Sequence, residues 1–269
     1  MAAERKVVKT VLSKEQAQGV GARVRRSIGR PELKNLDPFL LLDEFKGGKP
    51  AGFPDHPHRG FETVKYSEGF SGHSSEMFMT AGRGILHAEM PCSQEPAHGL
   101  QLWVNLRSSE KMVEPQYQEL KSAEIPKPSQ NGVTVSVISG ESLVHRRCIY
   151  LDFKLNEGAK HVQPVPQGWT AFIYTLAGNM YIGPAGAQKK AEPHHTAVLD
   201  DEDCVRVENK DPEVSHFVLV AGEPLKEPVV QYGPFVMNTQ EEIQQAIDDF
   251  RNARNGFERA TTWKSKIGN

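Results

Sequence analysis

The feature that most constrains the fold is a succession of short segments in which apolar and polar residues alternate, with glycine and proline between them. A period of two places the apolar side chains on one face of a β-strand. Short strands at even spacing are typical of a β-sandwich or β-barrel. We therefore expect an all-β protein, and the segments that carry this expectation are residues 100–106, 133–138, 149–155, 196–199, 204–207 and 216–221.

One segment near the end of the chain has a helical pattern instead. Residues 239–250 begin with Thr239, and Glu242 follows three positions later, which is the pattern of a capping box. The apolar residues after it recur at helical spacing. The sequence therefore predicts one short C-terminal helix.

The length of the chain and one proline-rich segment predict two domains. A chain of 269 residues is long for one compact domain and comfortable for two. Residues 114–128 are charged and contain three prolines, which is typical of a connection. We therefore predict an N-terminal domain of residues 1–125 and a C-terminal domain of residues 126–269 that includes the helix.

Two pairs of side chains have the spacing of metal ligands. His56 and His58 lie in Asp-His-Pro-His-Arg-Gly, and His87 and Glu89 lie in Gly-Ile-Leu-His-Ala-Glu-Met. Residues two apart in a strand point to the same face, so two such strands facing each other would gather three imidazoles and one carboxylate. This set suits iron(II), manganese or another mid-series divalent metal and leaves coordination positions open. The alternative is that these are surface or core-edge histidines.

The C-terminal half lacks a copy of these pairs. His194 and His195 are adjacent, so in a strand they would point to opposite faces, and His161 and His216 stand alone. We therefore expect the C-terminal domain to be metal-free.

The segments around both pairs resemble a known family. Residues 55–64 and 80–90 are similar to the signature strands of the pirin family, which belongs to the cupin superfamily, and the resemblance runs from about residue 20 to residue 269. It implies two cupin-like β-barrel domains, a bicupin, followed by a short helix. It also implies one iron per chain, as Fe(II) or Fe(III), whose four ligands fall on His56, His58, His87 and Glu89.

Two segments are shorter than the family pattern. They lie near residues 67–78 and 140–148. A missing barrel strand would expose two sheet edges and part of the core. The sequence therefore predicts an incomplete N-terminal barrel, in which metal affinity depends on whether His58 and His87 still face each other. His73, in the first segment, is expected to be a loop residue and not a substitute ligand.

Residues 19–30 form the densest basic cluster of the chain, with Arg23 and Arg25 on one face of an alternating strand and Lys34 close behind. One interpretation is a solvated edge strand whose charges discourage aggregation. The other is a docking patch for an acidic or protein partner. The resemblance favours the patch and implies partner-binding residues Arg23, Glu32 and Lys34, with an NF-κB-type transcription factor and an ankyrin-repeat coactivator as partners.

Charge and cysteine content exclude several classes. Lys+Arg (32) nearly balances Asp+Glu (34), which argues against strong direct nucleic-acid binding. Three widely spaced cysteines, Cys92, Cys148 and Cys204, suggest no disulfide framework. The first residues lack the apolar core of a signal peptide, and no run approaches the roughly 20 apolar residues of a membrane helix. We expect a monomer in the nucleus and cytoplasm, with no direct membrane contact.

Three hypotheses for function remain open at this point. The resemblance implies quercetin 2,3-dioxygenase activity on a flavonol such as quercetin, with three histidines anchoring the metal, Glu89 balancing its charge and no catalytic residue beyond these ligands. The second hypothesis is a nuclear coregulator that acts as a protein-binding module tuned by its iron. The third is a shortened, poorly metallated variant that acts only as a binding module.

Overall fold

The computed structural model describes residues 2–68, 74–91, 94–121, 124–139 and 148–266, and the chain divides into two compact units. The histidine unit contains Glu15–Gly29, Pro38–Ser122 and Leu225–Asn269. The companion unit contains the remaining segments, which are Met1–Lys14, Arg30–Asp37 and Ala123–Pro224. Each unit is therefore assembled from three stretches of sequence, and the change of unit after Ser122 lies close to the predicted boundary at residue 125.

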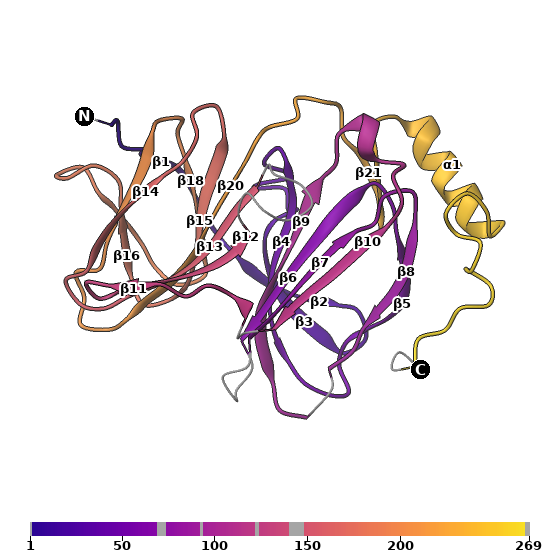
Figure 1. Cartoon of the computed structure of the whole chain (residues 1–269), viewed down its shortest axis with the longest axis horizontal. Helices are drawn as coiled ribbons and strands as arrows, with labels where there is room; N and C mark the ends of the chain where they lie inside the picture. Colours follow the sequence, from indigo (N-terminus) through magenta and orange to yellow (C-terminus); the bar gives the residue numbers. More distant parts are fainter. Residues whose placement is uncertain (1, 69–73, 92–93, 122–123, 140–147, 267–269) are drawn as a thin grey trace. The chain divides into compact units, whose positions relative to one another are not determined.

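The companion unit consists of a seven-stranded sheet in the order β1-β18-β15-β20-β13-β12-β11 and a four-stranded sheet in the order β14-β19-β16-β17 (Figure 1). The strands are β1 Val7–Leu12, β11 Ser129–Gln130, β12 Val133–Ser139, β13 Cys148–Leu155, β14 Lys160–Pro164, β15 Thr170–Ala177, β16 Met180–Ile182, β17 Lys189–Ala191, β18 His195–Leu199, β19 Cys204–Glu208 and β20 Ser215–Gly222.

The core of the companion unit is apolar. Alternate residues of β13, β15 and β20 point inward, and the register places Phe153 opposite Phe217, whose rings stack with centroids 5.0 Å apart. Leu151 and Leu219 continue the same facing row. The period-two pattern in the sequence is thus a core-facing pattern, as predicted.

The histidine unit is built on a second seven-stranded sheet, in the order β10-β7-β6-β9-β4-β3-β2, with two two-stranded sheets, β5-β8 and β21-β22 (Figure 1). Its strands are β2 Lys14–Gln18, β3 Ala22–Ile28, β4 Phe39–Gly47, β5 Phe53–His58, β6 Phe61–Glu68, β7 Ser74–Thr80, β8 Ile85–Glu89, β9 Ala97–Asn105, β10 Gln116–Lys121, β21 Val230–Tyr232 and β22 Phe235–Met237. A 3₁₀ helix, η1, spans Ser108–Glu110.

The sheet of the histidine unit is continuous on both sides of the shortened segment. Antiparallel pairing of β6 with β7 runs from Glu62↔Thr80 to Glu68↔Ser74, and β10 extends the sheet beyond β7. Residues 69–73, which include His73, and residues 140–147 lie outside the described residues. An incomplete barrel stays a prediction, but a seven-stranded sheet is present to support the site.

The C-terminal helix α1, Gln240–Arg251, begins with the predicted capping box between Thr239 and Glu242. Its apolar stripe packs on β21 and β22 and also on Leu86 of β8. Because of these contacts α1 belongs to the histidine unit, whereas the sequence placed it with the C-terminal half. The division at 125/126 into independently folding domains stays a prediction. In the part of the chain that the structure describes, no helix has the length and apolarity needed to span a bilayer.

Candidate metal centre

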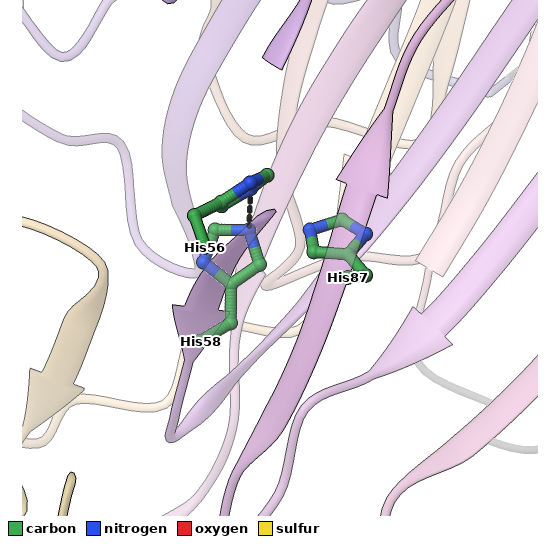
Figure 2. A group of neighbouring side chains, drawn as sticks. All are labelled: His56, His58 and His87. Atoms are coloured by element: carbon green, nitrogen blue, oxygen red, sulfur yellow. Dashed lines mark hydrogen bonds between the residues drawn. The ribbon is translucent and has the colours of Figure 1, made fainter. Parts of the chain in front are cut away.

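The predicted ligand residues lie on two short strands that pair with each other. β5 and β8 are antiparallel, and their register places His56 opposite His87 and His58 opposite Ile85. Pro57 has no backbone N–H to donate, which fits a strand whose neighbour in its sheet is β8 alone. The three imidazoles converge from these two strands into one space (Figure 2). The prediction that the histidines of both pairs face each other is confirmed.

The geometry suits a shared ion. One ligand atom from each of the three histidines lies within 4.8 Å of the others. His56 Nδ1 is 2.7 Å from the carbonyl oxygen of Pro54, and because a carbonyl only accepts, this nitrogen carries the proton. In the neutral ring this leaves the lone pair on His56 Nε2, which is 3.1 Å from His58 Nε2. A backbone hydrogen bond that fixes the ring in this way is typical of a metal-ligating histidine.

Burial keeps two of the rings uncharged. It holds the pKa of His58 well below its usual value of 6.5, and the neighbouring imidazoles of His87 and His56 lower it further. Burial also lowers the pKa of His87 to about 4, although Glu89 opposes the shift. Both rings thus carry a free lone pair at neutral pH, and His87 Nε2 is buried with no hydrogen-bond partner among the described residues. An orphaned nitrogen beside two others fits an imidazole-bound metal.

Glu89 lies beside this group but faces other partners. Its Oε2 is 3.6 Å from Lys65 Nζ, and its Oε1 accepts a hydrogen bond of 3.3 Å from Gln101 Nε2. The distance from Oε1 to His87 Nδ1 is 3.9 Å. Among the described residues, the cluster of ligand atoms within 4.8 Å comprises the three histidines. Glu89 as the fourth ligand therefore stays a prediction. Lys65 would compete with a bound metal for the Glu89 carboxylate.

The sequence reasoning missed Lys65, Gln101 and Trp103 as residues of the site. The register of β6 with β9 places Lys65 opposite Gln101 and Thr63 opposite Trp103. The Trp103 ring lies 5.3 Å from the His58 ring, centroid to centroid. The sequence contained a signal for two of these residues. Gln101 and Trp103 occupy alternate positions of a strand whose other face is apolar, so both point away from the apolar core.

Two cavities adjoin the cluster. The larger, of ≈ 620 Å³, is lined by His56, His58, Glu89 and Trp103 among others. The smaller, of ≈ 300 Å³, includes Phe45 and Lys65, and it shares Phe53, Glu89 and Gln101 with the larger one. Both volumes are in the range of small-molecule sites.

The predicted partner-binding residues are divided between the two units. Arg23 lies on β3 of the histidine unit with 62% of its side chain exposed and pairs with Glu15. Glu32 and Lys34 are exposed in the companion unit, where Glu32 accepts hydrogen bonds from Lys14 and Arg30. The edge-strand interpretation of this segment needs correction, because β2 forms the end of the sheet and β3 lies inside it. The patch stays a prediction.

Two cysteines and one further histidine lie outside the cluster. Cys148 and Cys204 are not joined by a disulfide, and Cys92 lies outside the described residues, so the expected lack of a disulfide framework stays a prediction. His98 is bound to Glu44, with 2.8 Å between Nε2 and Oε1, so it has a structural partner outside the cluster.

Comparison with known proteins identifies the family. A family model described as pirin matches residues 21–77 and 67–104, and one described as the pirin C-terminal cupin domain matches residues 150–256. The human protein named Pirin is 72% identical over 290 aligned positions that cover 100% of both chains. The chain belongs to the pirin family. A pirin-like protein of Solanum lycopersicum is 49% identical and covers 97% of each chain.

The pirin-family alignment also supports the first shortened segment, whereas the second, near residues 140–148, stays a prediction. It spans 290 positions, whereas the chain has 269 residues, so 21 positions have no residue here. The two matches of the pirin model overlap at residues 67–77, which is where the first shortened segment was predicted. A break in the match at this place is what missing residues would produce.

Solved structures bear out the predicted bicupin fold. The crystal structure of a quercetin 2,3-dioxygenase from Acinetobacter baumannii superposes with a TM-score of 0.81 at 31% identity, covering 93% of this pirin-family chain and 98% of that one. The bacterial pirin YhhW from Escherichia coli, in complex with nickel(II), shares the fold with a TM-score of 0.63 at 18% identity, covering 80% and 99%.

Proposed function

We propose that this pirin-family chain binds one iron ion through His56, His58, His87 and Glu89 and acts as a dioxygenase of the quercetin 2,3-dioxygenase type on a flavonol such as quercetin. The observation that carries the proposal is the cluster of three imidazoles. Burial holds two of them, His58 and His87, uncharged, and His56 and His58 line a ≈ 620 Å³ cavity. The name of the Acinetobacter baumannii relative gives the reaction class.

The histidines and Glu89 would have different roles in the reaction. A metal held by the three histidines would lower the pKa of a substrate hydroxyl and offer open positions for oxygen. Glu89 lies at the wall that both cavities share, and if it leaves the metal its carboxylate can accept the proton of that hydroxyl. Glu89 contacts Lys65 and Gln101 at 3.6 and 3.3 Å, so Lys65 competes with the metal for this carboxylate.

Aromatic side chains fit the class of substrate. The Trp103 ring lies 5.3 Å from the His58 ring and lines the larger cavity, and Phe53 borders both cavities. Planar aromatic substrates gain from offset or edge contacts with such rings. A flavonol could place its hydroxyls at the histidines while its rings contact this wall.

The proposal is tested by loading the protein with iron(II) without oxygen, measuring iron per chain, and then recording oxygen uptake with quercetin. We expect about one iron per chain and uptake that the His58→Ala variant loses. His98→Ala is the matched control, because His98 is bound to Glu44 outside the cluster. Full iron without uptake would favour a binding module, and substoichiometric iron would favour the shortened, poorly metallated variant.

A second candidate function is supported by the exposed basic side chains. We propose that Arg23, Glu32 and Lys34 dock an NF-κB-type transcription factor and an ankyrin-repeat coactivator in the nucleus, with a further population of the protein in the cytoplasm. The support is the exposure of all three residues and the positive charge of Arg23 and Lys34.

Charge reversal tests the docking patch. Arg23→Glu and Lys34→Glu should each weaken binding of the transcription factor, with the larger effect at low ionic strength because salt screens such contacts. Lys190→Glu, at an exposed lysine of the companion unit, is the control. An affinity that neither variant changes would reject the patch and leave the enzyme proposal intact.

A further inference from the structure

The residue that follows His58 is a fully buried arginine. Arg59 is 1% exposed, and its Nη1 donates a 2.9 Å hydrogen bond to Oδ2 of Asp249, which is equally buried on α1. Its Nη2 donates to the carbonyl of Asn255 at 2.5 Å, and its guanidinium lies 4.7 Å from the centre of the Phe257 ring. The C-terminal end of β5 is thus bound to the helix and to the turn after it.

The same C-terminal segment is bound to the start of β8. Arg59 Nε donates to the carbonyl of Arg83 at 2.6 Å. A side-chain carbon at Gly84 would lie 2.8 Å from the Phe257 ring, and one at Gly256 would lie 2.4 Å from the Arg83 carbonyl, so the two backbones approach closely.

Both strands that carry the histidines therefore end on one support. β5 reaches it through Arg59, and β8 reaches it through the Arg83–Gly84 backbone and through Leu86, which packs in the cluster of Phe235, Ile243 and Phe257. Among the described residues, the sheet of β5 and β8 has these two strands alone, and the backbone of Arg59 is also bonded to Pro234 and to Val236 of β22. The separation of His58 from His87 then depends on how α1 holds the two strand ends.

We infer that Arg59 and Asp249 are positioning residues of the metal centre, and that α1 with the turn to Phe257 is a structural part of it. The expected effect on metal affinity rests on the proposed function. The support of β5 and β8 by α1 rests on contacts within the histidine unit. The pair fixes the spacing of the three imidazoles, so its loss should lower metal affinity by more than the loss of stability explains, in the 10–100-fold range typical of groups that orient metal ligands.

Stability and positioning can be separated by the choice of variants. Removing one partner of a buried ion pair leaves an uncompensated charge and destabilises the protein, whereas replacing both partners by apolar side chains is often neutral. Asp249→Asn breaks the pair. Arg59→Met with Asp249→Leu recovers packing but lacks the donors to Arg83 and Asn255. Asp248→Asn, one position earlier on the same helix, is the matched control.

Two readouts decide the inference. The first is amide hydrogen exchange of the metal-free protein in residues 53–59 and 83–89. The second is a cobalt(II) titration that records both affinity and the ligand-field spectrum. We expect the double variant to melt near the wild type, to exchange about 10-fold faster in those segments, and to bind cobalt(II) at least 10-fold more weakly with an altered spectrum.

Wild-type exchange and cobalt(II) affinity in the stable double variant would overturn the inference. If the wild type itself binds no cobalt(II) or iron(II), the proposed function fails, but the exchange measurement still decides whether α1 holds the two strands. Faster exchange spread evenly over β6 and β9 would also count against positioning, because it would indicate a general loss of stability.

Discussion

The two units have seven-stranded sheets of the same size but bury different chemistry. In the companion unit, the register between neighbouring strands places Phe153 opposite Phe217 with their rings stacked. In the histidine unit, the register places Lys65 opposite Gln101, next to Trp103. In the companion unit, apolar side chains from neighbouring strands pack together and fill the core. In the histidine unit, polar side chains of the sheet border a cavity beside the imidazoles.

The difference shows how one architecture serves two purposes. Isolated histidines in the companion unit have local partners, as His216 does through a 2.6 Å hydrogen bond between its Nε2 and Asp152. In the histidine unit, His87 Nε2 is buried with no hydrogen-bond partner among the described residues. Burial of an unpaired polar atom costs free energy, so it points to a ligand that supplies the missing interaction.

The largest expected effect is on the apolar core of the companion unit. Phe217→Ala should lower the free energy of unfolding by about 3–5 kcal/mol, because it leaves a cavity beside Phe153. Chemical denaturation followed by tryptophan fluorescence and circular dichroism measures this. A loss below about 1 kcal/mol would mean that the companion core can collapse around the gap.

A buried lysine gives the histidine unit its own pH dependence. Lys111 Nζ donates to Asn105 Oδ1 and to the carbonyls of Gly60 and Val236, and burial lowers its pKa from 10.5 to about 8. Between these values the unfolded chain binds more protons, so the free energy of unfolding should increase with pH by about 3 kcal/mol. Below pH 8 both states are charged and this contribution stays constant.

Denaturation curves between pH 7 and 10.5 test this dependence in wild type and in Lys111→Met. The variant should lack the increase, while Lys190→Met, at an exposed lysine of the companion unit, should keep it. Parallel pH profiles for wild type and Lys111→Met would contradict the assignment.

The contact between Lys65 and Glu89 predicts a gain of metal affinity on mutation. Lys65→Met removes a cation that holds the carboxylate and repels an incoming metal, so affinity should increase by about 10-fold, or about 1.4 kcal/mol. Lys65→Arg keeps the charge and serves as the control. Weaker binding by Lys65→Met would mean that Lys65 supports the site and does not compete with it.

The smallest effect is expected at the N-terminus of α1. Thr239→Ala removes the hydroxyl that accepts from the Glu242 backbone and should cost about 1 kcal/mol. Thr239→Ser keeps the hydroxyl and should stay close to wild type. Calorimetric melting distinguishes the two, and equal melting of both variants would show that the cap contributes little here.

Local features of the fold and site were predictable from the sequence. The alternation that identifies β9, the capping box of α1 and the two-residue spacing of His56 and His58 each depend on a few neighbouring residues. Strand and helix periodicities are properties of the local backbone, so they can be read without knowing the partners.

Features that depend on distant partners were not predictable. Arg59 and Asp249 are 190 positions apart, and no spacing rule connects them. The packing of α1 on the histidine unit was not predictable for the same reason, because its apolar stripe indicates burial but not the surface that buries it. Lys65 as a competitor for Glu89 required the register between β6 and β9.

The support that α1 gives to β5 and β8 has a consequence for synthesis on the ribosome. Asp249 and Phe257 are translated after Ala123–Pro224, the last segment of the companion unit. Nascent domains generally fold as units while translation proceeds. The companion unit can therefore fold while the histidine-bearing strands still lack their support, so an ion held by His56, His58 and His87 would be bound only late in synthesis.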